Sequence, residues 1–340
     1  MDNRLHNKNY TMEDIALELG VAKSTVSRAL ADSKRISAET REKIQQFAKT
    51  HGFKPNLVAR ALAGQKTLNL AVVMPLEATA VQMMFFHECL SGIVTSAAKQ
   101  GYSVLVCMTN DNGGDELLES LLTNHRVDGV ILTQLLQEDK NLKIVREYGL
   151  PFVVIGSGAG DDVFHVDSRM KECCEEFTEM CAKKVCDGGR VLFVCGSLGI
   201  VANNNRLSGF LAGMENLTEK NLKYAVCSNY LDIGTEFDLK DWHLILCSDD
   251  VVCSKILEIS RKHGFSIGED KDFMLASFHD SIILESNCPG ISALRVNAFG
   301  LGEKAGEVAL KLLSSAKDGV ECEIEKNNYV ECSYEMREST

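Results

Sequence analysis

Apolar residues in the first 55 positions recur every three or four residues, which is the spacing of short amphipathic helices. Residues 11–19 and residues 22–30 each carry one apolar face, and Gly20 lies in the turn between them. A third such pattern begins at residues 36–41 and ends at the Gly- and Pro-containing stretch 52–56. Two helices joined by a short turn predict a helix-turn-helix, whose second helix enters the major groove of DNA.

The rest of the chain alternates short apolar runs with longer amphipathic patterns. The apolar runs predict buried strands at 70–74, 102–106, 129–132 and 152–155, and again at 191–194, 244–246 and 273–276. The amphipathic patterns predict helices at 85–100, 116–124 and 142–148, and then at 173–186, 206–215 and 251–263. Buried strands that alternate with helices predict a parallel sheet covered on both faces.

The predicted fold class is therefore an all-α helix-turn-helix head joined to an α/β body of two doubly wound parallel-sheet lobes. Ligands of such sheets bind beyond the carboxyl ends of the strands. We therefore expect a ligand site in the cleft between the two lobes.

The net charge of −12 is unevenly distributed along the chain. Residues 1–66 hold 12 Lys and Arg against 7 Asp and Glu, a net charge of +5, and the remaining 24 basic and 41 acidic residues give −17. Contacts with DNA phosphates need local positive charge, so a basic head on an acidic body fits a DNA-binding protein. No apolar run approaches the ~18 residues of a membrane span, and the first residues lack the apolar core of a signal peptide. We expect a cytoplasmic protein without membrane contact, which the 13 cysteines of so large a chain also fit.

The three-helix pattern and the residues that follow it, 56–62, resemble in order and spacing the head and hinge of the LacI/GalR family of bacterial transcription regulators. Scattered positions of the body match the family as well, among them Pro75, Arg206 and residues 248–250. The resemblance implies a periplasmic-binding-protein-like body and a homodimer bound to a near-palindromic, double-stranded DNA operator. It places the head at 1–55, the hinge helix and linker at 56–67, an N-terminal lobe at 68–165 with 298–319, and a C-terminal lobe at 166–297 with 320–340.

The second helix of the head is expected to read the operator. By the resemblance, Lys23, Ser24 and Arg28 contact base edges, and the Arg28 guanidinium can offer guanine two parallel donors. Further polar residues are placed for phosphate contacts, which fix orientation rather than sequence. These are Thr11, Thr25, Ser27, Arg35, Ser37 and Thr40.

The hinge is expected to add a second kind of DNA contact through Asn56, Ala59 and Leu62. Leu62 matches a family leucine that wedges into a central base step from the minor groove, which unstacks the bases and kinks the duplex. The segment is too short to form a helix alone, so it is expected to fold only on DNA. The family usually has Asn at the position of Ala31, so one contact is expected to be missing here.

The resemblance also implies a set of effector-binding residues in the cleft. Arg206 matches the family's cleft arginine, a donor suited to sugar hydroxyls, carboxylates or phosphates. His279 stands where the family commonly has Asp, and a His and an Arg in one cleft would suit an anionic ligand. At least one of Phe85 and Phe86 is expected to belong to the core. The full expected set is Phe85, Phe86, Arg206, Tyr230, Ser248, Asp249, His279 and Asp280.

Other possible chemistries are weaker. The glycine-rich residues 156–160 follow a strand, but no helix opens after them, so we interpret them as a cleft loop rather than a dinucleotide-binding loop. The cysteines show no close Cys-x-x-Cys pair, so neither a metal nor a cofactor is expected. Four of them lie at helical spacing and are expected in the core: Cys173, Cys174, Cys181 and Cys186.

No Ser/His/Asp constellation stands out, so we expect no enzymatic activity. We predict a sequence-specific transcription regulator, interpreted as a repressor, whose operator affinity depends on a sugar or sugar phosphate bound between two lobes. Effector binding would change lobe closure, and both an inducer and a corepressor fit. Two alternatives stay open: the effector is a nucleobase or another metabolite, or the chain is a ligand-binding protein of the same fold without a role at DNA.

Overall fold

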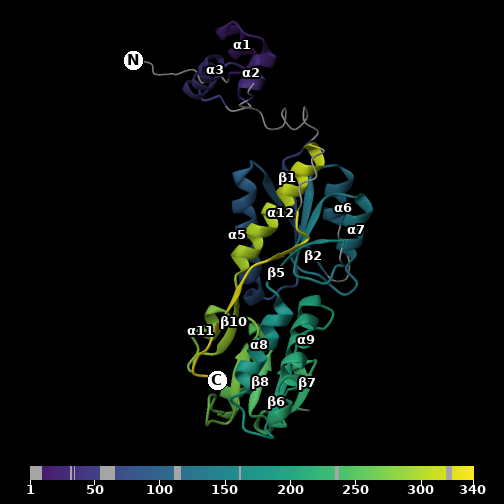
Figure 1. Cartoon of the computed structure of the whole chain (residues 1–340), viewed down its shortest axis with the longest axis vertical. Coiled ribbons are helices and arrows are strands. Elements are labelled where there is room, and N and C mark those ends of the chain that lie inside the picture. Colours follow the sequence, from purple (N-terminus) through teal and green to yellow (C-terminus); the bar gives the residue numbers. More distant parts are fainter. Residues whose placement is uncertain are drawn as a thin grey trace. The chain divides into compact units, whose positions relative to one another are not determined.

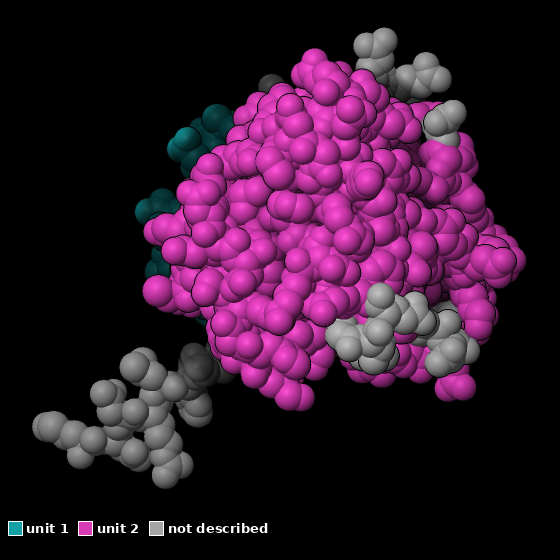
Figure 2. Space-filling view, turned by 90° about the horizontal axis from the view of Figure 1, so that it is seen from below, with its two compact units in different colours: residues 1–67 teal, residues 68–340 magenta. Residues whose placement is uncertain are grey.

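The chain divides into two compact units, residues 1–67 and residues 68–340, which Figure 2 colours separately. The computed structural model describes residues 10–30, 33, 35–53, 66–110, 116–160, 162–233, 237–318 and 324–340. Within these residues, no helix is long and apolar enough to cross a membrane.

The first unit is a three-helix domain of α1 (Met12–Leu19), α2 (Lys23–Leu30) and α3 (Ala38–Thr50). Thr11 begins α1 with a capping box, because its hydroxyl accepts the Asp14 N–H at 3.2 Å and its own N–H donates to the Asp14 carboxylate at 2.8 Å. Gly20 ends α1 at φ 64°, a left-handed conformation that a side chain would strain. The three helices meet in a core that buries Ile15, Ala16, Val26, Ala29, Ile44 and Ala48. The predicted three-helix head is therefore confirmed.

The second unit contains two six-stranded sheets. The first has the order β11-β5-β4-β3-β1-β2, and all its neighbouring strands are parallel. Its strands are β1 (Asn69–Pro75), β2 (Ser103–Thr109), β3 (Gly129–Leu132), β4 (Phe152–Ile155), β5 (Phe164–Asp167) and β11 (Asn327–Tyr329). The chain order reverses at β1, and such a switch point opens a crevice at the carboxyl ends of the strands.

The second sheet has the order β12-β10-β9-β8-β6-β7, in which β12 runs antiparallel to β10 and the other pairs are parallel. Its strands are β6 (Arg190–Val194), β7 (Lys223–Cys227), β8 (Leu244–Cys247), β9 (Met274–Ser277), β10 (Ser292–Val296) and β12 (Cys332–Glu335). The order reverses at β6, so this sheet has a corresponding switch point.

Helices cover both faces of each sheet (Figure 1). Those of the first lobe are α5 (Ala80–Lys99), α6 (Glu116–Thr123), α7 (Lys140–Tyr148) and α12 (Ala298–Asp318). Those of the second lobe are α8 (Met170–Ala182), α9 (Val201–Glu215), α10 (Asp250–His263) and α11 (Ile282–Glu285), with short 3-10 turns at Thr218–Lys220, Tyr230–Asp232 and Leu239–Asp241. The predicted architecture of two doubly wound lobes is confirmed.

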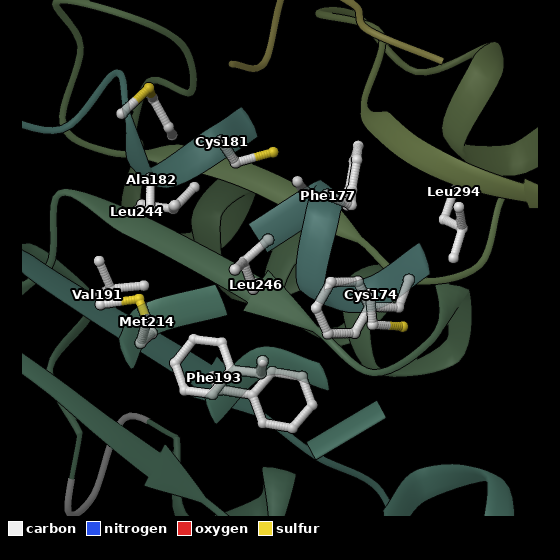
Figure 3. Packing of buried hydrophobic residues seen from close by; sticks show 14 of the residues in the cluster. Cys174, Phe177, Cys181, Ala182, Val191, Phe193, Met214, Leu244, Leu246 and Leu294 are labelled. Carbon is white, nitrogen blue, oxygen red and sulfur yellow. The ribbon is translucent and has the colours of Figure 1, made fainter. Parts of the chain in front are cut away.

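One buried layer of the second lobe lies between its sheet and the helices α8 and α9. Figure 3 shows part of it, with Phe193 and Leu246 from the sheet and Cys174 and Phe177 from α8. The Phe193 and Phe210 rings stack at 4.9 Å between centroids, which ties β6 to α9. This packing fixes α9, and with it the residues that α9 presents to the cleft.

The four cysteines expected in the core differ in their burial. Cys174 and Cys181 are buried, whereas Cys186 is exposed, which corrects the expectation for that residue. Cys173 packs partly buried against the core of the second lobe and forms a disulfide with Cys332 of β12.

Three connections pass between the lobes: β5 to α8, β10 to α12, and β11 to β12. The β11 to β12 connection departs from the expected boundary, which assigned all of 320–340 to the second lobe. Instead β11 extends the first sheet along β5, because Asn327 pairs in register with His165 and the His165 N–H donates to the Lys326 carbonyl at 2.6 Å. The strand β5 also runs to Asp167, two residues beyond the expected end of the first lobe.

Candidate nucleic-acid interface and ligand cleft

The helix α2 presents the side chains expected to read bases. Lys23, Ser24 and Arg28 are exposed, as is Ser27, whereas Thr25 is half-buried. Lys23 forms an ion pair with Glu13 of α1. The Arg28 guanidinium has no hydrogen-bond or ion-pair partner among the described residues of the head, so its five donors are open to an external acceptor.

The expected phosphate-contact residues of the other helices lie at helix starts. Thr11 caps α1, and Ser37 caps α3 by accepting the Thr40 N–H at 3.3 Å while its hydroxyl donates to Thr40 Oγ1 at 2.8 Å. Arg35 is exposed just before α3. Helix starts present free backbone N–H groups, so these positions suit phosphate oxygens, and their contact with DNA stays a prediction. Asn56, Ala59 and Leu62, together with Ala31, lie outside the described residues.

A cavity lies between the two lobes of the second unit, at the carboxyl ends of strands from both sheets. From the first lobe it is lined by Gln82, Phe85, Phe86, Thr133, Gln134, Leu135, Ile155, Gly156, Ser157, Asp167 and Ser168. From the second lobe it is lined by Met170, Ile200, Val201, Ala202, Asn203, Asn205, Arg206, Asp249, Asp250, His279 and Val296, and Leu301 of α12 adds a contact from the first lobe. Seven of these residues are neutral amides or hydroxyls, the groups that pair with hydroxyl-rich ligands.

The lobes contact each other directly at the edge of this cavity. The Gln137 N–H donates to the Gly199 carbonyl at 2.9 Å, and the Val201 N–H donates to the Leu135 carbonyl at 3.0 Å. These two bonds flank an antiparallel bridge between residues 136 and 200. Asn205 Nδ2 of α9 also donates to Ser157 Oγ at 3.0 Å. The structure therefore has the two lobes closed on one another.

Five of the eight expected effector residues line the cavity: Phe85, Phe86, Arg206, Asp249 and His279. Phe86 is also part of the core of the first lobe, at 6 % exposure, whereas Phe85 reaches across to His279 with ring centroids 5.5 Å apart.

The other three expected residues do not line this cavity. Tyr230 packs on the far core of the second lobe. Ser248 is fully buried, and its hydroxyl accepts the Gly196 N–H at 3.0 Å. Asp280 is held by the guanidinium groups of Arg295 and Arg337. Ser248 and Asp280 are each adjacent in sequence to a lining residue, but all three side chains are engaged by the protein itself.

Arg206 is a nearly buried cation with a carboxylate beside it. Its Nη1 donates to Asn203 Oδ1 at 3.0 Å and lies 3.8 Å from Asp249 Oδ2, while its Nε has no hydrogen-bond partner in the described structure. Asp249 in turn caps α10 by accepting the Val252 N–H at 2.9 Å. Arg206 therefore keeps one buried donor free for a ligand, although its charge is already compensated.

His279 has a carboxylate neighbour of its own, because its Nδ1 lies 3.5 Å from Asp250 Oδ1. Burial alone would raise the pKa of Asp250, but the interaction with His279, aided by Ser281 and Arg206, lowers it overall. Burial raises the pKa of Asp167 on the opposite wall, against the backbone N–H groups of Ser168 and Met170. The cavity thus holds three carboxylates against one arginine and one histidine.

The sequence interpretation missed several lining residues, notably Thr133, Ser157, Asp167 and Asp250. Two of them, Thr133 and Asp167, directly follow or end a strand of a parallel sheet, so the rule that ligands lie beyond carboxyl ends could have identified them. Asn203 and Asn205 are different, because the helix that carries them begins at Val201 rather than at the predicted residue 206. Among the described residues, no group of three or more His, Cys, Asp or Glu could hold a metal ion.

Family models match both units of the chain. "Bacterial regulatory proteins, lacI family" matches residues 11–56, "Periplasmic binding proteins and sugar binding domain of LacI family" matches residues 67–236, and "Periplasmic binding protein-like domain" matches residues 190–340. The chain belongs to the LacI family of bacterial regulatory proteins and is a DNA-binding transcription regulator with a periplasmic-binding-protein-like sensor.

Individual relatives are similar along most of their length. The HTH-type transcriptional regulator MalR of Streptococcus pneumoniae is 26% identical over 319 residues, which covers 91% of this chain and 94% of that protein. Catabolite control protein A of Staphylococcus epidermidis is 24% identical over 322 residues, with 92% and 94% covered. Among solved structures, the Lac repressor dimer bound to operator and the anti-inducer ONPF shares the fold with a TM-score of 0.75 at 19% identity, covering 98% of this chain and 99% of that one. The relatives are transcriptional regulators, not enzymes.

Proposed function

We propose that this regulator is a cytoplasmic repressor that binds a near-palindromic operator as a homodimer and has no catalytic activity. We further propose that its effector is a neutral, hydroxyl-rich metabolite of the sugar class, bound in the cavity between the lobes. The observation that carries the effector proposal is the carboxylate that lies beside each basic cleft residue, Asp249 beside Arg206 and Asp250 beside His279.

An anionic effector fits this cavity poorly. A phosphate or carboxylate near Arg206 would also face Asp249, Asp250 and Asp167, and like charges in a site with little water repel strongly. Neutral hydroxyl groups avoid that repulsion. The carboxylates can accept hydrogen bonds from the hydroxyl groups, and Arg206 Nε and the amide groups can donate hydrogen bonds to the hydroxyl oxygens. The anionic ligand considered from the sequence is therefore the less favoured choice. One structure of similar fold is a complex of the transcriptional regulator CelR with cellobiose.

A homodimer is supported by apolar residues left exposed on the second unit. Met84 and Val94 of α5 are 44 % and 45 % exposed, and Ile282 of α11 is 56 % exposed. Large apolar side chains that share a surface are typical of subunit interfaces. Met84 and Ile282 border the same groove, so one partner surface could cover both.

The effector proposal is tested by thermal unfolding of the protein with neutral sugars, their phosphates and nucleobases. A ligand that binds only the folded state at 100 times its Kd stabilises by about 2.7 kcal/mol, which gives a clear rise in Tm. We expect a neutral sugar to raise Tm and its phosphorylated form to do so less. A response to sugar phosphates with none to the parent sugars would refute the neutral-ligand proposal.

The DNA proposal is tested with an operator duplex selected from random sequences. Arg28→Ala should weaken binding to the selected duplex by about 1–3 kcal/mol, because it removes a base contact, and should leave binding to scrambled DNA nearly unchanged. As a control, Lys49→Ala on α3 removes the same charge from another exposed position. It should weaken binding to both duplexes slightly and to the same extent. Equal losses on both duplexes for Arg28→Ala would show that this residue contacts phosphate only.

A further inference from the structure

An ion pair joins the two helices of the helix-turn-helix at the start of the second one. Lys23 is the first residue of α2, and its Nζ donates to the Glu13 carboxylate at 2.5 Å. Glu13 is the second residue of α1, so the contact spans the turn that contains Gly20. The two side chains keep 60 % and 68 % of their surface exposed, so the pair remains accessible to a DNA duplex.

The pair distinguishes Lys23 from Arg28, the other basic residue of α2. The sequence of α2 contains no acidic residue, and the Arg28 guanidinium has no partner among the described residues of the head. Within that part of the chain, Glu13 therefore brings a negative charge from α1 to one of the two cations of the reading helix and not to the other.

The stability of the head does not account for a cation at this position. The N-terminus of a helix carries a partial positive charge, which disfavours Lys23 at the start of α2 and favours Glu13 in the first turn of α1. An ion pair between exposed side chains adds little to folding, because water screens it and two long side chains lose freedom. Glu13 thus offsets an unfavourable placement of Lys23, whose value must lie in a contact outside the head.

A lysine without a partner contributes to DNA binding mainly as a charge. Its ammonium is a point charge on a flexible stem that can turn to any phosphate within reach, and phosphate contacts add affinity on every sequence. A carboxylate beside the ammonium opposes this use, because it compensates the charge and repels phosphate oxygens. The ammonium protons that Glu13 does not accept stay available, and guanine offers the acceptors O6 and N7 in the major groove.

We propose that Glu13 determines operator specificity by positioning Lys23 as a reader of one guanine per half-site and keeping it from phosphate. Glu13 acts through Lys23 and is therefore a positioning residue. The inference rests on the proposed operator binding and on the expected contact of Lys23 with a base edge. Glu13→Gln keeps the size of the side chain and removes its charge, so it releases Lys23 to the phosphates.

The role is tested by selecting duplexes from random sequences with the wild type, Glu13→Gln and Glu18→Gln. Glu18 is an exposed carboxylate five positions further along α1, so its variant makes the same change of charge on another side of the helix. For Glu13→Gln, the ratio of affinities for selected and scrambled duplexes should fall at least about fivefold, the lower end for a good base contact. The guanine preference at one position of each half-site should weaken, and the salt slope on scrambled DNA should steepen by about 1. Glu18→Gln should change the preference at no position.

A Lys23→Gln background shows whether Glu13 acts through Lys23. Lys23→Gln should remove the same guanine preference, and adding Glu13→Gln should then change base preference no further. An unchanged preference in Glu13→Gln, whatever its Tm, or the same change in Glu18→Gln would overturn the inference.

Failure of the proposed function gives a different result. If the wild type enriches no sequence, the proposed operator binding is refuted together with the role of Glu13. If it enriches a sequence whose preference Lys23→Gln alters and Glu13→Gln does not, only the role of Glu13 is refuted.

Discussion

The Asp280 carboxylate is the centre of a clamp that joins three segments of the second lobe, and its removal gives a direct test of the structure. Arg337 donates to both Asp280 oxygens at 2.8 Å, and Arg295 of β10 donates to Oδ2 at 2.8 and 3.0 Å. The Asp280 side chain is only 2 % exposed, and that of Arg337 is 14 % exposed. The clamp therefore holds the end of β9 against β10 and the C-terminal segment.

Asp280→Asn should lower the free energy of unfolding by about 3 kcal/mol. Removing one partner of a buried ion pair costs about 3–5 kcal/mol, and the lower end applies because Arg295 is 46 % exposed and the amide can keep one hydrogen bond. Urea unfolding followed by the fluorescence of Trp242, the single tryptophan, reports on this lobe. Tm should fall by about 6 °C or more. As a matched control, Glu258→Gln removes an exposed carboxylate from α10 and should change neither quantity measurably.

The difference in the free energy of unfolding between the wild type and Asp280→Asn should also depend on pH. Burial acts to raise the pKa of Asp280, but the hydrogen bonds from Arg337 and Arg295 outweigh it and lower the pKa. A carboxyl with a lowered pKa stabilises the fold above its unfolded pKa of about 3.9, and the stabilisation is lost as pH falls through the folded-state value. The stability gap should therefore be constant from pH 5 to 8 and shrink below pH 4. A gap under about 1 kcal/mol at pH 7, or a loss of sugar binding without a loss of stability, would refute the clamp and return Asp280 to the ligand site.

Three further predictions concern the effector, the hinge and the assembly. Arg206→Ala should weaken sugar binding, measured by calorimetry, by about 1.5–3 kcal/mol, which is the value of a hydrogen bond to a charged group. Operator affinity without sugar should stay unchanged, and a sugar affinity equal to wild type would contradict the cleft assignment. Leu62→Ala should weaken operator binding and reduce DNA bending together, while the circular dichroism of the free protein stays the same; an unchanged bend angle would make Leu62 a linker residue only. Sedimentation at micromolar concentration should give the mass of two chains, because residues 320–340 lack the heptad spacing of an added tetramerisation helix; a mass of four chains would rule this out.

Much of the fold could be predicted because its signals are local. The strands at Gly129–Leu132 and Phe152–Ile155 have the predicted bounds, since each is a fully apolar run between polar or turn residues. The strand Lys223–Cys227 was not predicted, because it lies at the edge of its sheet and its first two residues are exposed. The strand Ser292–Val296 was missed for a related reason, since Ser292 and Arg295 interrupt its apolar pattern; Ser339 of the distant tail satisfies Ser292, and Asp280 pairs with Arg295.

The assignment of the tail to one lobe failed because β11 and β12 join different sheets, and the partner of β11 lies more than 150 positions away in the sequence. A polar, strand-like segment contains no local information about which sheet it joins. The same distance hid the Cys173–Cys332 pair, whose members show no motif spacing. Topology, rather than periodicity, determines both features.

The chemistry of the cleft shows where sequence adjacency misleads. Asp249 and Asp250 are consecutive, yet Asp249 lies beside Arg206 and Asp250 beside His279, because the first residue caps α10 and the second begins it. Arg206 and His279 alone indicate a receptor for an anion, and only their distances to these two carboxylates show that each basic side chain already has an acidic neighbour. Arg206 alone therefore does not indicate the charge of the ligand. Asp249, which lies within about 4 Å of Arg206 and caps a different helix, has to be considered with it. The charge of an effector in this fold has to be inferred from the pairing of the cleft residues, which is set by the packing of the two lobes and not by the order of residues along the chain.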